Sequence, residues 1–187
     1  MSRWDPGAKG RLAEAARTLF IEQGFDRTTV ADIAARAGLT ERTFFRHFAD
    51  KREVLFAGDM LSARMSDVVA SAPSDLAPLE VVTLAVEDAC DAITSNPDWS
   101  RDRARIVAEH ADLRERELGK MAVLASALAD GLRARDVPES TAVVAAELGA
   151  LAFRLAYERW AVGPRADRLA PLVRVVLAEV GSITDTA

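Results

Sequence analysis

The sequence has little cysteine, few aromatic residues and no long apolar run, and each shortage excludes a class of protein. Cys90 is the only cysteine among 187 residues, which excludes an internal disulfide framework and any metal site built from several cysteines. No apolar run approaches the ~20 residues that a membrane span needs, and the first seven residues lack the apolar segment of a secretion signal. We therefore expect a cytoplasmic protein with no metal, no cofactor and no membrane partner.

Signals for β-strands are also missing, because apolar and polar residues do not alternate over any stretch. Hydrophobic residues make up 50% of the chain and aromatic residues only 6%, and much of the apolar half is alanine, a strong helix former. The pattern predicts an all-α protein with about nine helices, over roughly 8–23, 30–37, 41–48, 51–71, 78–94, 98–110, 113–135, 139–162 and 168–181. Asp50, Asn96 and Asp112 are placed to cap the fourth, sixth and seventh of these helices.

Two of the shorter predicted helices form a helix-turn-helix. Thr29 is placed to cap the first, with Asp32 three residues later in the position of a capping-box acid. Gly38 permits a sharp left-handed turn, Leu39 fills the angle, and Thr40 begins the next helix. The second helix of such a motif can enter a DNA major groove, although an ordinary corner between two helices is the alternative explanation.

The charge is distributed unevenly along the chain. Residues 1–52 hold ten Lys/Arg against seven Asp/Glu, a net charge of +3, which leaves −8 for the remainder because the whole chain carries −5. A basic N-terminal part attached to an acidic remainder indicates that one local surface, in the N-terminal part, binds a polyanion.

A wider set of residues around this motif occurs in a fixed order and spacing. The set is Leu19-Phe20, Gly24-Phe25, Thr28-Thr29-Val30, Asp32-Ile33-Ala34, Ala37-Gly38-Leu39, Thr43-Phe44-Phe45, His47-Phe48 and Lys51. Over about residues 8–56 it closely resembles the N-terminal DNA-binding domain of TetR-family transcriptional regulators. Over 57–187 the resemblance rests on the number, length and placement of helices, and two later segments resemble an actinobacterial subgroup.

The resemblance implies which side chains contact DNA. The predicted recognition helix offers Glu41, Arg42, Phe45 and Arg46 to the major groove, where arginine pairs with guanine and glutamate accepts a bond from cytosine. Phe45 departs from the family, which usually has tyrosine there, so one phosphate hydrogen bond is lost while ring contact with a thymine methyl or a sugar remains. The expected phosphate contacts are Thr28, Thr29, Thr43, His47 and Lys51.

The acidic body is expected to enclose an effector, in a pocket with apolar and aromatic walls and few polar groups. For each candidate, plain core packing is the alternative. Arg103 and Arg154 are candidates to meet a carboxylate or phosphate of the effector, with helix salt bridges such as Arg154 to Glu158 as the alternative. The candidates are Cys90, Trp99, Arg103, His110, Met121, Leu124, Phe153, Arg154, Tyr157 and Trp160.

The last two helices carry apolar residues on more than one face, so they need neighbours on both sides. In the family these helices pair with their twofold mates in a four-helix bundle, and small residues such as Gly149 let helix axes approach closely. A buried monomeric core is the alternative. The predicted dimer interface is Val144, Leu148, Leu151, Leu155, Leu172, Val173, Val176 and Val180.

These features together predict a helix-turn-helix DNA-binding domain over 1–52 and a helical effector-binding and dimerisation domain over 53–187. The expected function is a homodimeric transcriptional regulator, a repressor released from double-stranded operator DNA by a small, mainly apolar effector. A helical ligand-binding protein with little DNA affinity is the alternative. An enzyme is not expected, because the chain has two histidines, one cysteine and no nucleophile elbow, phosphate loop or metal-ligand spacing.

Overall fold

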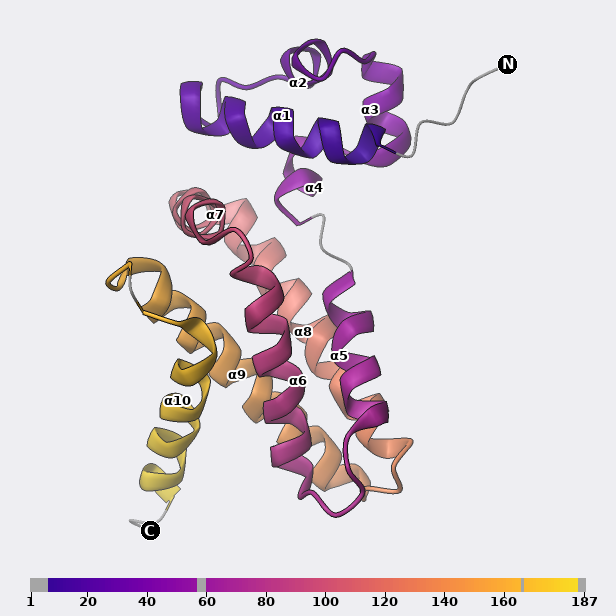
Figure 1. Cartoon of the computed structure of the whole chain (residues 1–187), viewed down its shortest axis with the longest axis vertical. Coiled ribbons are helices and arrows are strands. Elements are labelled where there is room, and N and C mark those ends of the chain that lie inside the picture. The colour runs from indigo at the N-terminus through magenta and orange to yellow at the C-terminus, as the bar shows by residue number, and fades with distance from the viewer. Residues whose placement is uncertain (1–6, 57–59, 166, 185–187) are drawn as a thin grey trace. The chain divides into compact units, whose positions relative to one another are not determined.

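The computed structural model describes residues 7–56, 60–165 and 167–184, and the regular elements in these ranges are ten α-helices (Figure 1). The all-α fold predicted from the sequence is thereby confirmed. The chain forms two compact units, Met1–Gly58 and Asp59–Ala187, whereas the sequence suggested a boundary after residue 52. The roles assigned to the two parts stay predictions. Residues 1–6, where the sequence lacks a secretion signal, lie outside the described ranges.

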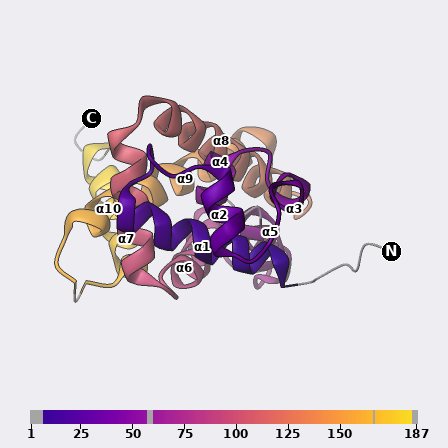
Figure 2. The same cartoon turned by 90° about the horizontal axis from the view of Figure 1, so that it is seen from above.

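The N-terminal unit consists of four short helices around one small core. Helix α1 packs against the other three helices. Helix α2 crosses α1 and also packs against α3 (Figure 2). The core is made by apolar side chains that recur every three or four residues, chiefly Leu12, Ala16, Phe20, Ile33, Phe44 and Phe48. The helices are α1 (Ala8–Gln23), α2 (Val30–Arg36), α3 (Glu41–His47) and α4 (Lys51–Leu55).

The C-terminal unit is a bundle of six helices. Helices α5, α6, α8 and α9 pack side by side, α10 packs against α6 and α9, and α7 packs against α8 and α9 at one end of the bundle (Figure 1). Their bounds are α5 (Met60–Ser71), α6 (Pro78–Ile93), α7 (Pro97–Glu109), α8 (Ala111–Arg133), α9 (Glu139–Val162) and α10 (Leu169–Thr184).

Polar caps begin several of these helices as the sequence predicted. The Thr29 hydroxyl accepts from the Asp32 amide and the Asp32 carboxylate accepts from the Thr29 amide, so the capping box is present. Thr40, Asp50 and Asn96 likewise cap α3, α4 and α7. These predictions are confirmed because a cap depends only on neighbours along the chain.

Two local predictions are wrong. The sequence favoured one helix over 51–71, but α4 ends at Leu55, Phe56 adopts a turn with a buried side chain, and α5 begins at Met60. The predicted helix is therefore interrupted after Leu55. Asp112 was expected to cap α8, but the helix begins two residues earlier than predicted, at Ala111, and His110 occupies the capping position.

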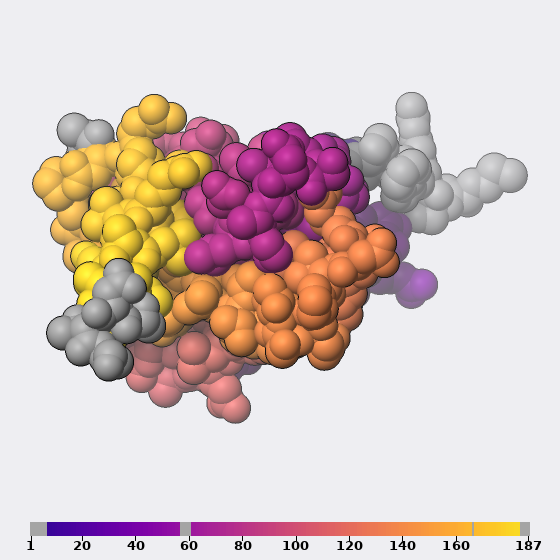
Figure 3. Space-filling view, turned by 90° about the horizontal axis from the view of Figure 1, so that it is seen from below, coloured from indigo at the N-terminus to yellow at the C-terminus, as the bar shows by residue number. Residues whose placement is uncertain are grey.

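Two connections lie next to each other at the other end of the bundle. Arg135, in the α8–α9 connection, donates to the backbone oxygens of Val69 (3.1 Å), Ala72 (2.7 Å) and Pro73 (2.6 Å) where α5 ends. Figure 3 shows this end, with the purple α5–α6 connection beside the orange α8–α9 connection. A charge-assisted bond to each of three carbonyl groups fixes the two turns relative to each other.

Among the described residues, α9 alone is long and apolar enough to cross a membrane by length and composition, with a mean hydropathy of 1.2 over its most apolar window. The sequence reading had found no such run. Core helices of folded domains pass the same test, and one face of α9 is covered by α6, α8 and α10.

Candidate nucleic-acid interface

The turn between α2 and α3 has the geometry that a helix-turn-helix requires. Gly38 adopts a φ of +67°, in the left-handed region that favours glycine. The Leu39 amide donates to the Ala34 oxygen at 2.9 Å, and the Thr40 hydroxyl accepts from the Thr43 amide at 3.2 Å. The end of α2 and the start of α3 are therefore both hydrogen-bonded, which fixes the angle between the helices.

One face of α3 is buried and the opposite face is free for a ligand. Phe44 is fully buried, whereas Glu41, Arg42, Phe45 and Arg46 are exposed. Within the part of the chain that the structure describes, neither Arg42 nor Arg46 forms an ion pair. The Phe45 ring, 55% exposed, meets the Phe44 ring edge-on with centroids 5.6 Å apart. The exposed face of α3 therefore presents an apolar ring together with two guanidinium groups that form no ion pair among the described residues.

The two threonines before α2 lie in different environments. Thr28 is 1% exposed and its hydroxyl donates to the Gly24 oxygen at 2.8 Å, so its side chain supports the turn after α1. Thr29 is exposed and belongs to the capping box with Asp32. Hydrogen bonds from the hydroxyl and amide of Thr29 hold the pKa of the Asp32 carboxyl below its ordinary value. Of the pair, only Thr29 presents its side chain to the surface.

Two further predicted phosphate contacts are half-buried. The Thr43 hydroxyl lies 3.0 Å from the Thr40 hydroxyl at the start of α3. His47, at the end of α3, has its Nε2 atom enclosed and without a hydrogen-bond partner among the described residues. Both side chains keep some exposed surface for a phosphate.

Lys51 differs most from its predicted role. Its Nζ atom lies 2.8 Å from the Phe25 oxygen, 3.1 Å from the Asp26 oxygen and 2.9 Å from the Thr28 oxygen. The same atom lies 4.5 Å from the centroid of the Phe25 ring. Burial lowers the pKa of the ammonium group below its ordinary value. All three N–H donors of this lysine are directed at backbone oxygens of the α1–α2 connection.

In the C-terminal unit, three predicted pocket residues form an aromatic row along α9. Phe153, Tyr157 and Trp160 are buried, with successive ring centroids 6.2 and 5.9 Å apart. Beside Tyr157, the Arg103 guanidinium pairs with the Glu117 carboxylate across α7 and α8. Burial acts to lower the pKa of Arg103, but the carboxylate more than offsets it, so the pKa lies above its ordinary value. The positive charge of Arg103, beside the aromatic row, is therefore already neutralised by Glu117.

The other pocket candidates are dispersed. Cys90 is fully buried in α6, and burial raises the pKa of its thiol to about 12. His110 lies at the α7–α8 junction with Nδ1 2.7 Å from the Ile106 oxygen, and Arg154 pairs with Glu158 at 3.1 Å. The remaining candidates are the half-buried Trp99 and Met121 and the buried Leu124.

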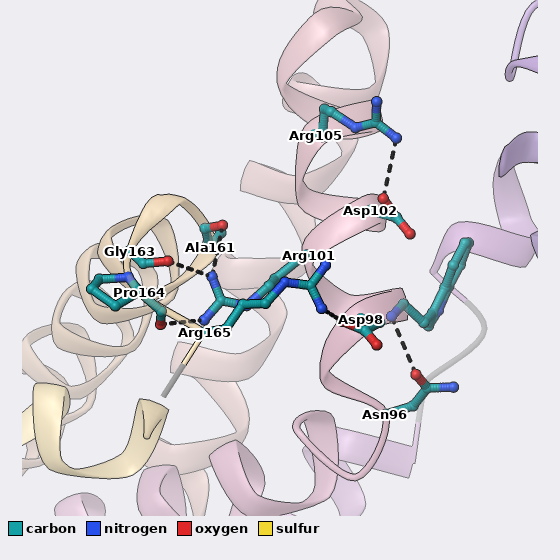
Figure 4. Close-up of polar contacts among 10 residues, drawn as sticks. Asn96, Asp98, Arg101, Asp102, Arg105, Ala161, Gly163, Pro164 and Arg165 are labelled. Carbon is teal, nitrogen blue, oxygen red and sulfur yellow. Dashed lines mark hydrogen bonds and ion pairs between the residues drawn. The ribbon is translucent and has the colours of Figure 1, made fainter. Parts of the chain in front are cut away.

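Arg101, which the sequence did not single out, attaches the start of α7 to the end of α9. Its guanidinium carbon lies 4.3 Å from the centroid of the Trp160 ring. Arg165, in the α9–α10 connection, pairs with Asp98 of α7 at 2.5 Å. The Arg101 guanidinium also donates to three backbone oxygens at the end of α9, those of Ala161, Gly163 and Pro164 (Figure 4). Bonds to main-chain oxygens leave no mark in the sequence, which is why Arg101 was missed.

An open groove of about 440 Å³ lies elsewhere in this unit, between the starts of α6 and α9. It contains two of the predicted interface residues, Val144 and Leu148, and none of the predicted pocket residues. Its lining is mainly apolar and consists of Ala77, Pro78, Leu79, Ser140, Thr141, Val144, Ala145 and Leu148.

The predicted interface residues fall into two groups. Val173 and Val176 are 0% and 1% exposed within one protomer, so they belong to the core and have no surface left for a partner. The others retain exposed surface. On α9 they form one stripe of Val144, Leu148, Leu151 and Leu155, and on α10 they are Leu172 and Val180.

Comparison with known proteins agrees with this geometry. Residues 12–57 match the family model described as "Bacterial regulatory proteins, tetR family". Over 88 residues the chain is 38% identical to the HTH-type transcriptional repressor KstR2 of Mycobacterium tuberculosis, covering 44% of each protein. The chain spans less than half the length of the curated relatives it matches.

Solved structures are similar over nearly the whole chain. A TetR-family transcriptional regulator from Syntrophomonas wolfei superposes with a TM-score of 0.67 at 16% identity, covering 94% of both chains. The transcriptional regulator FadR from Bacillus subtilis, solved with stearoyl-CoA, superposes with a TM-score of 0.61 at 17% identity, covering 90% of this chain and 95% of that one. The shared fold therefore extends to the C-terminal unit.

Proposed function

We propose that this chain, of which residues 12–57 match the TetR family model, is a homodimeric repressor which a small effector releases from operator DNA. The observation that carries the proposal is the exposed face of α3, the second helix of a helix-turn-helix, which presents an apolar ring and two arginines that have no ion-pair partner among the described residues. This combination fits hydrogen-bonded and apolar contacts with base edges.

Each exposed side chain of α3 is assigned a contact on the same grounds. Arg42 reads a guanine through its O6 and N7 atoms, and Glu41 accepts from a cytosine amino group. Phe45 contacts a thymine methyl or a sugar, since its ring offers no hydrogen bond. The remaining contacts with the groove and the phosphates are assigned to Arg46, Thr29, Thr43 and His47.

The first prediction concerns Arg42. We expect Arg42→Ala to weaken binding by about 1–3 kcal/mol, mainly at one base pair per half-site, because a bidentate contact discriminates by that amount. Retardation of a promoter fragment and of single-base variants measures it. Arg36→Ala is the matched control, because it removes the same charge from the same unit but from a guanidinium already paired with Glu22 at 2.6 Å.

Two results would count against this function. Equal losses on all sequences would remove the base-reading role from Arg42. Failure of the wild-type protein to retard any fragment with the specificity of an operator would favour the alternative, a helical ligand-binding protein with little DNA affinity.

For the effector, the buried aromatic row of α9 is the proposed wall and a mainly apolar molecule the proposed ligand. The Arg103 cation already has the Glu117 carboxylate as its partner, so an acidic ligand would have to displace Glu117 at the cost of burying an unpaired carboxylate. This argues for a ligand without a carboxylate at that point.

The second prediction follows from linkage. An effector that lowers operator affinity by a factor of about 5–150 must lose the same factor in its own affinity when the operator is bound. Calorimetric titration of a ligand, found by thermal-shift screening, with and without saturating operator measures the factor. A ligand that binds equally well in both cases is not the inducer.

A further inference from the structure

Lys51, the first residue of α4, directs its side chain back toward the connection between α1 and α2. The ammonium group has three N–H donors, and three backbone oxygens, those of Phe25, Asp26 and Thr28, lie 2.8–3.1 Å from Nζ. The face of the Phe25 ring lies beneath the same atom, at 4.5 Å from its centroid. We call this group of contacts the carbonyl clamp.

The carbonyl clamp joins the two ends of the helix-turn-helix. Thr28 and Lys51 are separated by 23 residues in sequence, and the segment between them contains α2, the Gly38 turn and α3. Both ends of the segment are themselves ordered, since the Thr28 hydroxyl bonds to Gly24 and the Asp50 carboxylate caps α4. A bond across these ends removes conformational freedom from all that lies between.

We propose that Lys51 is a positioning residue that fixes the recognition helix through the carbonyl clamp, and that it does not contact a DNA phosphate. The inference rests on the proposed DNA-binding function, of which it deepens one part. A phosphate contact would require the ammonium group to give up at least one of three charge-assisted bonds, each stronger than a bond between neutral groups. Inside the protein the same three bonds go to carbonyl groups outside the helices, of which that of Phe25 also accepts from the Thr28 amide at 3.3 Å.

The test compares Lys51→Met with Arg52→Met. Both variants remove one positive charge from the start of α4, but only the first removes the carbonyl clamp, because the Arg52 guanidinium is directed toward Asp50 at 3.9 Å. In the DNA-free protein, we expect Lys51→Met to accelerate amide hydrogen exchange in α2 and α3 about ten-fold. This factor corresponds to the smallest free energy usually contributed by a hydrogen bond to a charged group. Exchange in the middle of α1 should change little, and Arg52→Met should resemble the wild type.

The second readout is the salt dependence of operator binding, measured where each variant is fully folded. We expect Lys51→Met to lose about ten-fold in affinity on every sequence while its slope of log K against log salt equals that of Arg52→Met. A direct phosphate contact would instead reduce the slope of the Lys51 variant by about 1.8 more, at about 0.9 for each of the two phosphates in a dimer.

Three results would overturn the proposal. The first is a reduced salt slope of the Lys51 variant alone with unchanged amide exchange. The second is unchanged operator affinity with unchanged amide exchange. The third is faster amide exchange spread evenly over all four helices, which would mean a merely global loss of stability. If Lys51→Met does not fold, Lys51→Gln keeps an uncharged N–H donor at this position and should give a smaller change of the same kind. If the wild type binds no operator, the proposed function fails, while the exchange comparison still decides whether the carbonyl clamp holds the motif.

Discussion

Leu151→Glu is expected to convert the protein into a monomer that no longer binds its operator, although every recognition residue is intact. Leu151 is half-buried on the α9 stripe with Val144, Leu148 and Leu155, and is not part of the protomer's core cluster. In a twofold dimer the substitution places a carboxylate on both sides of the interface, and an unpaired buried charge costs several kcal/mol. We expect dimerisation to weaken by more than about 100-fold.

Operator binding is lost with the dimer because two half-sites must be contacted together, about one helical turn or a multiple of it apart. Sedimentation velocity and retardation of the operator measure the two effects. Val123→Glu is the control, because Val123 is an apolar side chain of α8 that is 56% exposed and lies outside the stripe. A Leu151→Glu variant that still sediments as a dimer would place the interface elsewhere.

The choice of Leu151 depends on the structure. The sequence assigned Val176 to the same interface, yet Val176 is 1% exposed inside one protomer. A charge there would disrupt folding, and the loss of a dimer would then carry no information about the interface.

Gly149→Ala is expected to destabilise the C-terminal unit strongly. A Cβ atom on Gly149 would lie 2.1 Å from the Val82 Cγ1 atom, so α6 and α9 would have to separate. Overpacking of this kind costs about 1–3 kcal/mol, and sometimes more, and each kcal/mol lowers Tm by about 2–4 °C in a chain of this size. Differential scanning calorimetry measures the change.

A second substitution and a control make the cause identifiable. Val82→Ala removes the clashing methyl groups, so the double variant should recover part of the stability that Gly149→Ala loses. Gly119→Ala should act in the opposite direction and stabilise by about 0.5–1 kcal/mol, because nothing lies within 4 Å of its new Cβ atom and alanine favours the α8 helix. Equal effects at Gly149 and Gly119 would contradict the steric explanation.

Features that depend on a few consecutive residues could be predicted from the sequence. The caps at Thr29, Thr40, Asp50 and Asn96 and the left-handed turn at Gly38 all depend on local geometry. The end of α4 at Leu55 was not predicted. The apolar pattern continued across it and dominated the interpretation.

Features that depend on the approach of distant segments could not be predicted. The sequence favoured a phosphate contact for Lys51, but it could not show that the side chain also bonds to three main-chain oxygens of the α1–α2 connection. Apolar periodicity likewise could not separate Val173 from Leu172, because which face of α10 meets α6 and α9 is decided by packing. Exposure in the folded unit made the distinction.

The buried thiol of Cys90 has a practical consequence for following the protein at work. Because this thiol is buried and its pKa is raised to about 12, we expect it to react little with maleimides at neutral pH, since the thiolate is the nucleophile. We therefore expect little thiol labelling of the folded protein, so Cys90 needs no substitution. A cysteine introduced at one exposed position of the N-terminal unit would carry one fluorophore or spin label per protomer. In the proposed dimer, the distance between the two labels would report how an effector changes the separation of the two N-terminal units.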